Sequence, residues 1–398
     1  MKTRFKCLVD NKFVIWGGLK IDGPYYGNVI LKILLNAGKS PNLGVVYGLF
    51  LILILIISVK ITMTWRQPAG VRNIHTSIAS QRLHAGDPIS KKNNLIQSIN
   101  PNYVTGFSDG EATFSISILK KPGYKLGYQV FPIFSIQLHK KDILLLEKLK
   151  SFFNVGTIRL KKNKDNINDT VIFSVQSLKD ITNSIIPHFN KYPLLTQKRA
   201  DFILFKEIID LMNKGKHLTN EGLLEIISIK ASMNKGLNES LKKEFPNVIP
   251  VNRPEINHKS PLIYDNQWLV GFAEAEGCFM CLVRKNVKHK IGYQVTLNFT
   301  LTQHIRDLEL MKKIKESLGL GLIYETATIV NYTITKKLEI DTIISMFDGK
   351  FLGAKNLDFQ DFLKIQEIVN KDLHKTEEGL NQIISIKKSM NTGRKDES

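Results

Sequence analysis

The chain has 398 residues, and its 56 Lys and Arg against 36 Asp and Glu give a formal net charge of +20 at pH 7. A protein this basic is expected to bind a polyanion, and phosphate contacts would dominate its affinity for a nucleic acid. The three cysteines, Cys7, Cys278 and Cys281, cannot form a disulfide framework, and one C-x-x-C pair leaves a zinc site incomplete. Composition therefore excludes a disulfide-rich scaffold and a zinc finger, and we interpret Cys278 and Cys281 as buried strand residues.

Residues 1–100 form a leader that differs in composition from the rest of the chain. They hold 13 Lys and Arg and 3 Asp and Glu, which is half of the net charge. Leu43 to Val59 is an uncharged, mostly aliphatic run, and snorkelling of Lys60 would extend it to the about 20 residues that a bilayer requires. We predict a transmembrane segment at residues 43–65, with a buried helix or an internal targeting signal as the alternative, followed by a flexible tether.

Two copies of one pattern follow the leader. The segment Gly106–Phe114 (GFSDGEATF) returns 165 positions later as Gly271–Phe279 (GFAEAEGCF). The same register persists beyond this signature, so the chain contains an internal duplication and is predicted to be pseudo-symmetric. The boundaries that we predict are a first repeat at residues 101–236, a proline-containing linker at 237–265 and a second repeat at 266–394.

Each repeat is predicted to fold as a helix, two strands, a helix, two strands and further helices, which is an α+β fold. The signature segment is the end of the first helix, and Thr113 to Lys120 follows as a strand with alternate apolar residues on one face. Asp142 to Phe153 and Asp307 to Leu318 are predicted amphipathic helices, each capped by its acid. These helices are expected to pack behind the sheet.

The clearest alternation of apolar and polar residues begins at Tyr293. One face of this strand is apolar and belongs to a core, and the other carries uncharged polar residues. Such a row is normally solvated, but it also suits hydrogen bonds to base edges in a groove wide enough for a β-ribbon. Both interpretations stay open at this point for the polar residues Gln294, Thr296, Asn298 and Thr300.

Lysines cluster where the hairpin turns are expected. A lysine at a turn is usually only solvated, yet at the end of a hairpin that lies beside a nucleic acid it is positioned to contact phosphates. The lysines for which we predict phosphate contact are Lys120, Lys121, Lys161, Lys162, Lys285 and Lys288.

The signature segments also bring acids together. Small residues recur four positions apart on each helix, so two such helices can pack closely; these residues are Gly106, Gly110, Gly271 and Ala275. Glu111 and Glu276 would then meet on the symmetry axis, where two carboxylates repel unless a proton or a metal intervenes. With phosphate oxygens as further ligands the pair suits Mg²⁺, so metal-assisted phosphodiester hydrolysis is the predicted chemistry.

These residues resemble the LAGLIDADG homing endonucleases, in the single-chain, two-repeat form found in organellar introns. The resemblance covers about residues 100–393 and rests on both signatures, on the LHKKD segment that ends at Asp142 and on the PLLTQKRADF segment at Pro193–Phe202. It implies a pseudo-two-fold pair of αββαββα repeats that form a DNA-binding β-saddle. The resemblance therefore favours DNA contact for the polar strand residues Gln294, Thr296, Asn298 and Thr300. It also implies a monomer that cuts double-stranded DNA at a long pseudo-palindromic target. Ala112 departs from the glycine that is usual in the first signature.

The resemblance implies roles for particular residues. Glu111 and Glu276 would bind the metal, Mg²⁺ with Mn²⁺ as a substitute. Lys198 and Lys355 match basic residues beside the active site, where a cation stabilises the pentacoordinate phosphate or orients solvent. Gln303 matches a solvent-positioning residue.

Two further features concern the balance of the site. The first-copy equivalent of Gln303 is Leu138, so the two halves of the site are expected to be chemically unequal. Asp109 and Glu274 stand two residues before the metal-binding acids and point to another side of each helix, so we expect them to make helix-end hydrogen bonds.

The function predicted from the sequence is a mitochondrial, intron-encoded, sequence-specific DNA endonuclease. In this family an intron reading frame often continues from an upstream exon, and such a fusion would explain a membrane-type leader. Two alternatives stay open. One is an RNA maturase that assists splicing of its own intron, and the other is a non-catalytic DNA-binding protein, which the presence of both acids disfavours.

Overall fold

The computed structural model describes residues 13–15, 19–21, 99–161, 170–258 and 264–391. The chain divides into two compact units, Met1–Lys92 and Asn93–Ser398. In the first unit, β1 (Phe13–Ile15) and β2 (Leu19–Ile21) pair antiparallel. The predicted membrane segment at residues 43–65 lies outside the described residues, and among the residues described no helix has the length and apolar character to cross a bilayer.

The second unit contains the two repeats, whose elements follow the same order except that two short helices of the first stand where the second has one longer helix. The first repeat consists of α3 (Pro101–Glu111), β3 (Ala112–Lys120), β4 (Tyr128–His139), α4 (Ile143–Phe153), β5 (Thr157–Lys161), β6 (Thr170–Val175), α5 (Leu178–Asp180), α6 (Ile186–Lys191), α7 (Lys198–Asn213) and α8 (Asn220–Ala231). After α9 (Glu239–Glu244) in the linker, the second consists of α10 (Asn266–Glu276), β7 (Gly277–Lys285), β8 (Tyr293–His304), α11 (Leu308–Leu318), β9 (Leu322–Glu325), β10 (Ile329–Ile334), α12 (Lys337–Phe347), α13 (Lys355–Asn370) and α14 (Glu377–Lys388).

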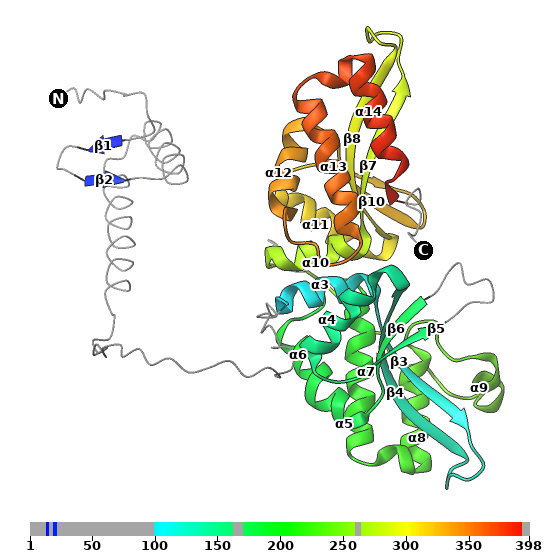
Figure 1. Ribbon diagram of the computed structural model, residues 1–398. Helices are drawn as coiled ribbons and strands as arrows, with labels where there is room; N and C mark the ends of the chain where they lie inside the picture. Colours follow the sequence, from blue (N-terminus) through cyan, green and yellow to red (C-terminus); the bar gives the residue numbers. More distant parts are fainter. Residues whose placement is uncertain (1–12, 16–18, 22–98, 162–169, 259–263, 392–398) are drawn as a thin grey trace, which may run out of the picture. The chain divides into compact units, whose positions relative to one another are not determined.

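Each repeat has one four-stranded antiparallel sheet. The strand orders are β3-β4-β6-β5 and β7-β8-β10-β9, and the registers correspond, with Lys120 opposite Tyr128 and Lys285 opposite Tyr293. The helices of each repeat gather on one side of its sheet, and α3 and α10 lie side by side between the repeats (Figure 1). The predicted α+β fold with paired sheets is confirmed for this unit.

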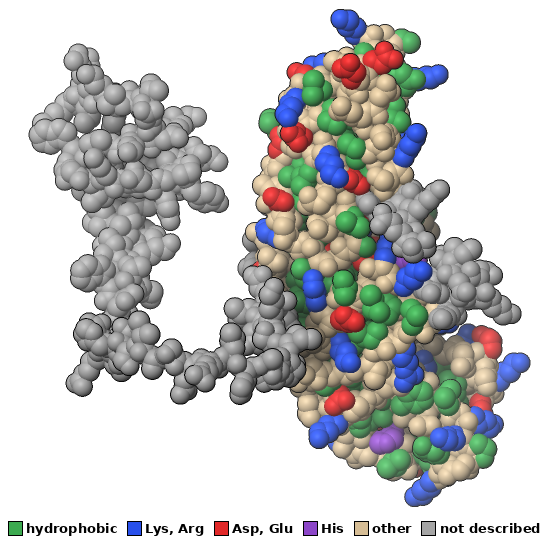
Figure 2. Space-filling model, viewed as in Figure 1, with side chains coloured by type: hydrophobic (Ala, Val, Ile, Leu, Met, Phe, Trp, Pro, Cys, Tyr) green, Lys and Arg blue, Asp and Glu red, His purple; other side chains and the backbone are tan. Residues whose placement is uncertain are grey.

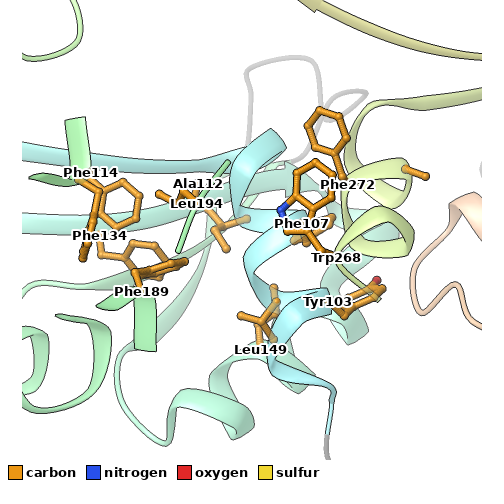
Figure 3. Close-up of a cluster of buried hydrophobic side chains, with 14 of the residues drawn as sticks. Tyr103, Phe107, Ala112, Phe114, Phe134, Leu149, Phe189, Leu194, Trp268 and Phe272 are labelled. Carbon is orange, nitrogen blue, oxygen red and sulfur yellow. The ribbon is translucent and has the colours of Figure 1, made fainter. Parts of the chain in front are cut away.

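An aromatic cluster fills the space between sheet and helices in each repeat. Phe114 of β3 contacts Phe134, Phe189, Phe202 and Phe205 at ring-centroid distances of 5.2–5.6 Å (Figure 3). Phe279, its equivalent in β7, contacts Phe299, Phe351, Phe359 and Phe362 in the same way. Cys281 faces this second cluster and is 2% exposed, as predicted, whereas Cys278 lies on the opposite face and is half-buried.

Close packing of α3 against α10 requires the small residues of the signatures. A β-carbon on Gly106 would lie 1.9 Å from the Trp268 carbonyl oxygen, and one on Gly271 would lie 2.1 Å from the Tyr103 carbonyl oxygen. Near the helix ends, a β-carbon on Gly110 would lie 2.3 Å from the Ala275 β-carbon. Backbone thus packs on backbone, as predicted, and Figure 3 shows Tyr103, Phe107, Trp268 and Phe272 around this contact.

Helices α4 and α11 occur where they were expected, but their predicted acid caps are wrong. Asp142 and Asp307 stand at the N-cap positions, and neither side chain accepts a hydrogen bond from its own helix. Both side chains bind backbone groups of the other repeat instead. At the other end the left-handed residues are Asn154 (φ 55°) and Gly319 (φ 67°), equivalent positions at which such a conformation terminates a helix.

The linker packs against the first repeat. Phe245, just after α9, lies with its ring centroid 5.5 Å from that of Tyr128, and Ile256 is buried. Arg253 donates to Asp201 at 2.7 and 2.9 Å and to the Gln197 carbonyl oxygen at 3.2 Å. The linker is thereby fixed to the N-terminal end of α7.

Candidate active site and nucleic-acid interface

Glu111 and Glu276 are the last residues of α3 and α10, and both are half-buried. Burial raises the pKa of Glu111, and repulsion from Glu276 adds to the rise, while Lys198 and Lys355 oppose it. Burial also raises the pKa of Glu276, against a hydrogen bond from Gln303 and the charges of the same two lysines. Two acids at one helix interface, each resisting ionisation, form a site suited to a cation.

A lysine lies beside each signature end. Lys198, the first residue of α7, donates from Nζ to the Gly110 carbonyl oxygen at 2.7 Å and to that of Ser108 at 3.1 Å. Lys355, the first residue of α13, donates from Nζ to the Gly277 carbonyl oxygen. Burial lowers the pKa of Lys198, and the nearby carboxylates of Asp109, Glu111 and Glu276 counteract this effect.

The two halves of the site differ at one strand position. Gln303 lies beside Glu276 and opposes the rise of its pKa. Its equivalent, Leu138, lines a cavity of about 160 Å³ together with Glu111, Asp142 and Lys355. The structure thus places a polar partner beside one acid and an aliphatic side chain beside the other.

Contrary to expectation, Asp109 and Glu274 do not bond to the ends of their own helices; they accept hydrogen bonds from backbone amides that precede α7 and α13. Asp109 accepts from the Leu195 and Thr196 amides, both at 2.9 Å, and Glu274 accepts from the Leu352 amide at 2.7 Å. Each also accepts a bond from the other repeat. Trp268 Nε1 donates to Asp109 at 2.7 Å, and the Tyr103 hydroxyl donates to Glu274 at 2.8 Å.

Sequence reasoning missed this pair of cross-repeat bonds. Tyr103 and Trp268 are related by the same 165-residue offset as the signatures, and both carry a donor on an aromatic ring. That shared property was a usable signal. The signal is weak, because two aromatic residues of different type are more readily explained as parts of a hydrophobic core.

The predicted base-contacting residues of β8 lie on the sheet face opposite the core. Gln294 is exposed and Thr296 is half-buried, whereas Asn298 and Thr300 are only 9% and 8% exposed. Thr300 Oγ1 donates to Asn298 Oδ1 at 3.0 Å and lies 3.3 Å from Thr333 Oγ1. The inner part of this row is therefore already hydrogen-bonded, and its outer part is accessible.

The predicted phosphate-contacting lysines separate into two groups. Lys161 continues the open face of its sheet, and Lys121 and Lys288 lie in the hairpin turns, whereas Lys162 is outside the described residues. Lys120 and Lys285 follow the core-facing alternation of their strands, and Lys120 pairs with Glu244 of the linker at 2.6 Å. Lysine and arginine side chains are dispersed among acidic ones on the face seen in Figure 2.

The donor set for a metal is small. Among the residues described, no group of three or more His, Cys, Asp and Glu side chains could enclose an ion. Glu111 and Glu276 supply two carboxylates, so phosphate oxygens and water would have to complete the coordination. This fits Mg²⁺, which usually binds through one or two carboxylates plus substrate phosphates and retains several waters.

The fold and the paired acids define one class of protein, with two similar repeats in a single chain, and the comparisons agree. The profile of the LAGLIDADG endonuclease family matches residues 104–209 and 269–366, one match in each repeat. The chain therefore belongs to the LAGLIDADG endonuclease family, as the sequence predicted.

Individual relatives support the same assignment. The chain is 37% identical over 305 residues to "Probable intron-encoded endonuclease 2" of Neurospora crassa, covering 73% of this chain and 65% of that protein. It is 39% identical over 290 residues to "Probable intron-encoded endonuclease 3" of the same fungus, covering 72% and 53%. The chain thus spans between about half and two thirds of these relatives.

Solved structures match the repeats as a unit. The I-SmaMI LAGLIDADG homing endonuclease bound to cleaved DNA aligns with a TM-score of 0.70 and 41% identity, covering 74% of this chain and 98% of that one. The I-LtrWI LAGLIDADG homing endonuclease bound to target DNA aligns with a TM-score of 0.70 and 39% identity, covering 74% and 98%.

Proposed function

We propose that this protein is a sequence-specific endonuclease that hydrolyses both strands of a DNA target and thereby promotes homing of its intron. The observation that carries the proposal is the pair Glu111 and Glu276 at adjoining helix ends, each flanked by a lysine on the first turn of another helix. Similarity to I-SmaMI bound to cleaved DNA supports the same activity.

Glu111 and Glu276 would hold a divalent cation, Mg²⁺ with Mn²⁺ as a substitute. When bound, the cation would polarise the scissile phosphate, lower the pKa of the attacking water and stabilise the leaving 3′ oxygen. A cation also removes the repulsion that raises the pKa of Glu111. I-SmaMI has been solved bound to uncleaved target in the presence of calcium ions, which favours a divalent ion in this family fold.

The lysines and Gln303 complete the chemistry that the protein itself supplies. The Nζ of Lys198 donates to two carbonyl oxygens, which leaves a remaining N–H available for a phosphate oxygen. In this position it would stabilise the charge that develops on the pentacoordinate phosphate. Gln303 would orient solvent beside Glu276, and Leu138 offers no equivalent hydrogen bond on the other side.

The open faces of the two sheets would bind a long, pseudo-palindromic DNA duplex. A monomer with two similar repeats presents two similar strand surfaces, so the halves of its target should be related in the same way. Gln294 and Thr296 would contact bases, and Lys161, Lys121 and Lys288 would contact phosphates. The protein would act in the mitochondrion, where residues 43–65, outside the described ranges, would anchor it to a membrane.

Cleavage of a plasmid that carries the joined exon sequence, without the intron, tests this function. We expect linear product in Mg²⁺ or Mn²⁺ and none with EDTA or with Glu111→Gln. A splicing assay on the precursor RNA, run beside it, separates the endonuclease from a maturase. Stimulated splicing without DNA cleavage would replace the proposal by the maturase function.

A further inference from the structure

Asp142 and Asp307 occupy N-cap positions but do not cap their own helices. Each ends a 3₁₀ turn, Lys140–Asp142 or Ile305–Asp307, immediately before α4 or α11. An aspartate there normally accepts a hydrogen bond from its own first turn. In this protein both carboxylates are directed to the other repeat.

The bonds that they accept lie beside the two lysines. Asp142 Oδ1 accepts from the Ala354 amide at 2.7 Å, and Asp307 Oδ1 accepts from the Gln197 amide at 2.7 Å. Ala354 and Gln197 are the N-cap residues of α13 and α7, and neither helix has a side-chain cap of its own. A carboxylate from one repeat thus satisfies the N-terminus of a helix in the other, where the helix dipole favours a negative charge.

The carboxylate charge lies next to a lysine whose position at the helix N-terminus is electrostatically unfavourable. Lys355 and Lys198 are the first residues of α13 and α7, and a cation at a helix N-terminus faces the positive end of the dipole. The aspartate of the other repeat compensates for that cost. It therefore favours the lysine's placement in the site.

A second carboxylate holds each segment from within its own repeat. Glu274 accepts from the Leu352 amide at 2.7 Å and from the Gly353 amide at 3.3 Å, just before Ala354. A β-carbon on Gly353 would lie 2.9 Å from Asp142 Oδ1 and 3.0 Å from Glu274 Oε1. The backbone that leads into Lys355 is enclosed between one carboxylate of each repeat.

We propose that Asp142 and Asp307 are positioning residues that act across the repeat interface, Asp142 on Lys355 and Asp307 on Lys198. The inference rests on the proposed nuclease function, since the lysines matter only beside a scissile phosphate. Its consequence is that neither lysine is correctly placed by its own repeat alone. Docking of the repeats and assembly of the two half-sites are one event.

Double-mutant cycles on the full chain test the pairing. With the exon-junction plasmid as substrate, Asp142→Ala should slow nicking of one strand about tenfold while DNA affinity stays within about twofold. Added to Lys355→Ala, the same change should have no further effect, because the group that it positions is gone. Added to Lys198→Ala, its effect should multiply in full. Equal effects on both lysine backgrounds would overturn the assignment.

Conservative variants separate positioning from general destabilisation. Asn keeps an oxygen that can accept from the Ala354 amide, so Asp142→Asn should restore nicking to within about threefold of wild type. Asp307→Asn should restore less, because Asp307 is 2% exposed and its Oδ2 lies 3.6 Å from Arg306 Nε, an ion pair that the amide loses. An Asp142→Asn variant as slow as Asp142→Ala would contradict the proposal.

Amide hydrogen exchange provides a readout that does not need cleavage. The Ala354 amide should be protected in wild type and in Asp142→Asn, and should exchange at least about tenfold faster in Asp142→Ala, with the Gln197 amide unchanged. If wild type cuts no DNA but this pattern holds, the proposed function fails and the cross-repeat contact stands. If wild type cuts DNA and the pattern is absent, the positioning inference fails alone.

Discussion

Comparison of the two repeats shows that contacts to the backbone are kept in both, whereas side chains on the open sheet faces differ. Asp109 and Glu274 bind equivalent backbone segments, and Asp142 and Asp307 cross to the partner repeat in the same way. Even Tyr103 and Trp268, which differ in type, donate equivalent bonds. Backbone geometry is common to both repeats, so the groups that recognise it are constrained together.

The open sheet faces have diverged. Phe131 and Ile133 of β4 stand where β8 has Thr296 and Asn298. Apolar side chains in a major groove contact thymine methyl groups, whereas amide and hydroxyl groups read hydrogen-bond donors and acceptors. The two halves of a target bound here should therefore follow different rules of base preference.

The linker contacts the first repeat at the N-terminal end of α7. Arg253 pairs with Asp201 at 2.7 Å, and both Asp201 and its equivalent Asp358 accept from a following asparagine amide, that of Asn234 or Asn391. The linker secures the N-terminal end of α7 through Arg253.

The largest effect is expected when the pair of acids is broken. Glu111→Gln and Glu276→Gln should each remove several kcal/mol of transition-state stabilisation, about a thousandfold in rate at ~4 kcal/mol, with DNA binding largely intact. The measurement is single-turnover nicking in Mg²⁺ with affinity determined separately, and exposed Glu378→Gln is the control. Near wild-type cutting by either variant would refute the metal assignment.

Substitution of each lysine should show which DNA strand each repeat helps to cleave. Lys198→Ala and Lys355→Ala should each slow cleavage about 10²–10³-fold, the cost of removing one group that stabilises transition-state charge. Nicking assays with one strand labelled at a time should show that the two variants slow different strands. Exposed Lys388→Ala serves as the control, and identical strand profiles would show that the lysines share one task.

Packing of α3 against α10 should tolerate no large side chain at the signature glycine of either helix. Gly106→Leu and Gly271→Leu should each cost about 1–3 kcal/mol of unfolding free energy or more, because the added side chain meets the partner's backbone. Gly123→Leu is the matched control, since a β-carbon there meets nothing within 4 Å. Thermal unfolding measures the difference, and an unchanged midpoint for Gly271→Leu would contradict the packing.

Exchanging the side chains at positions 303 and 138 should change the ratio of the cleavage rates of the two DNA strands. Gln303→Leu should slow cleavage of one strand about fivefold, the equivalent of ~1 kcal/mol for one hydrogen bond, and Leu138→Gln should speed the other by a similar factor. The ratio of the two nicking rates is the measurement. A double exchange that leaves this ratio as in wild type would show that position 138 or 303 does not orient solvent.

The smallest effect concerns stability against pH in the absence of metal. The folded-state pKa of Glu111 lies above its ordinary value of 4.5. The stability that protonation of Glu111 gives to the folded state is therefore fully present below pH 4.5 and is lost as pH rises through the raised pKa. Metal-free Glu111→Gln should therefore gain stability over wild type above pH 4.5 and match it below. Glu276→Gln should also gain stability over wild type above pH 4.5, since burial raises the pKa of Glu276 from the same ordinary value. Calorimetry at several pH values tests both, and Mg²⁺ should stabilise only wild type.

Local sequence patterns predicted much of the secondary structure and the division into two repeats. The duplication and the glycines of the signatures can be recognised directly in the sequence. Along β3, β4, β7 and β8, the spacing of apolar residues alone determines which residues share a face. Glu111 and Glu276 could be paired because each ends such a helix. Local spacing could not reveal the partner of Lys120, since Glu244 lies 124 residues away in the linker.

What the sequence by itself determined was the two repeats, their fold class and the acids that the helix interface brings together. What only the tertiary structure decided was the partner of each buried polar group. Asp142 stands at a helix start and by local rules should cap it, yet it bonds to Ala354, 212 residues away. A carboxylate binds whichever orphan amide the docked repeats present to it, and that choice depends on an interface formed only when both repeats have folded.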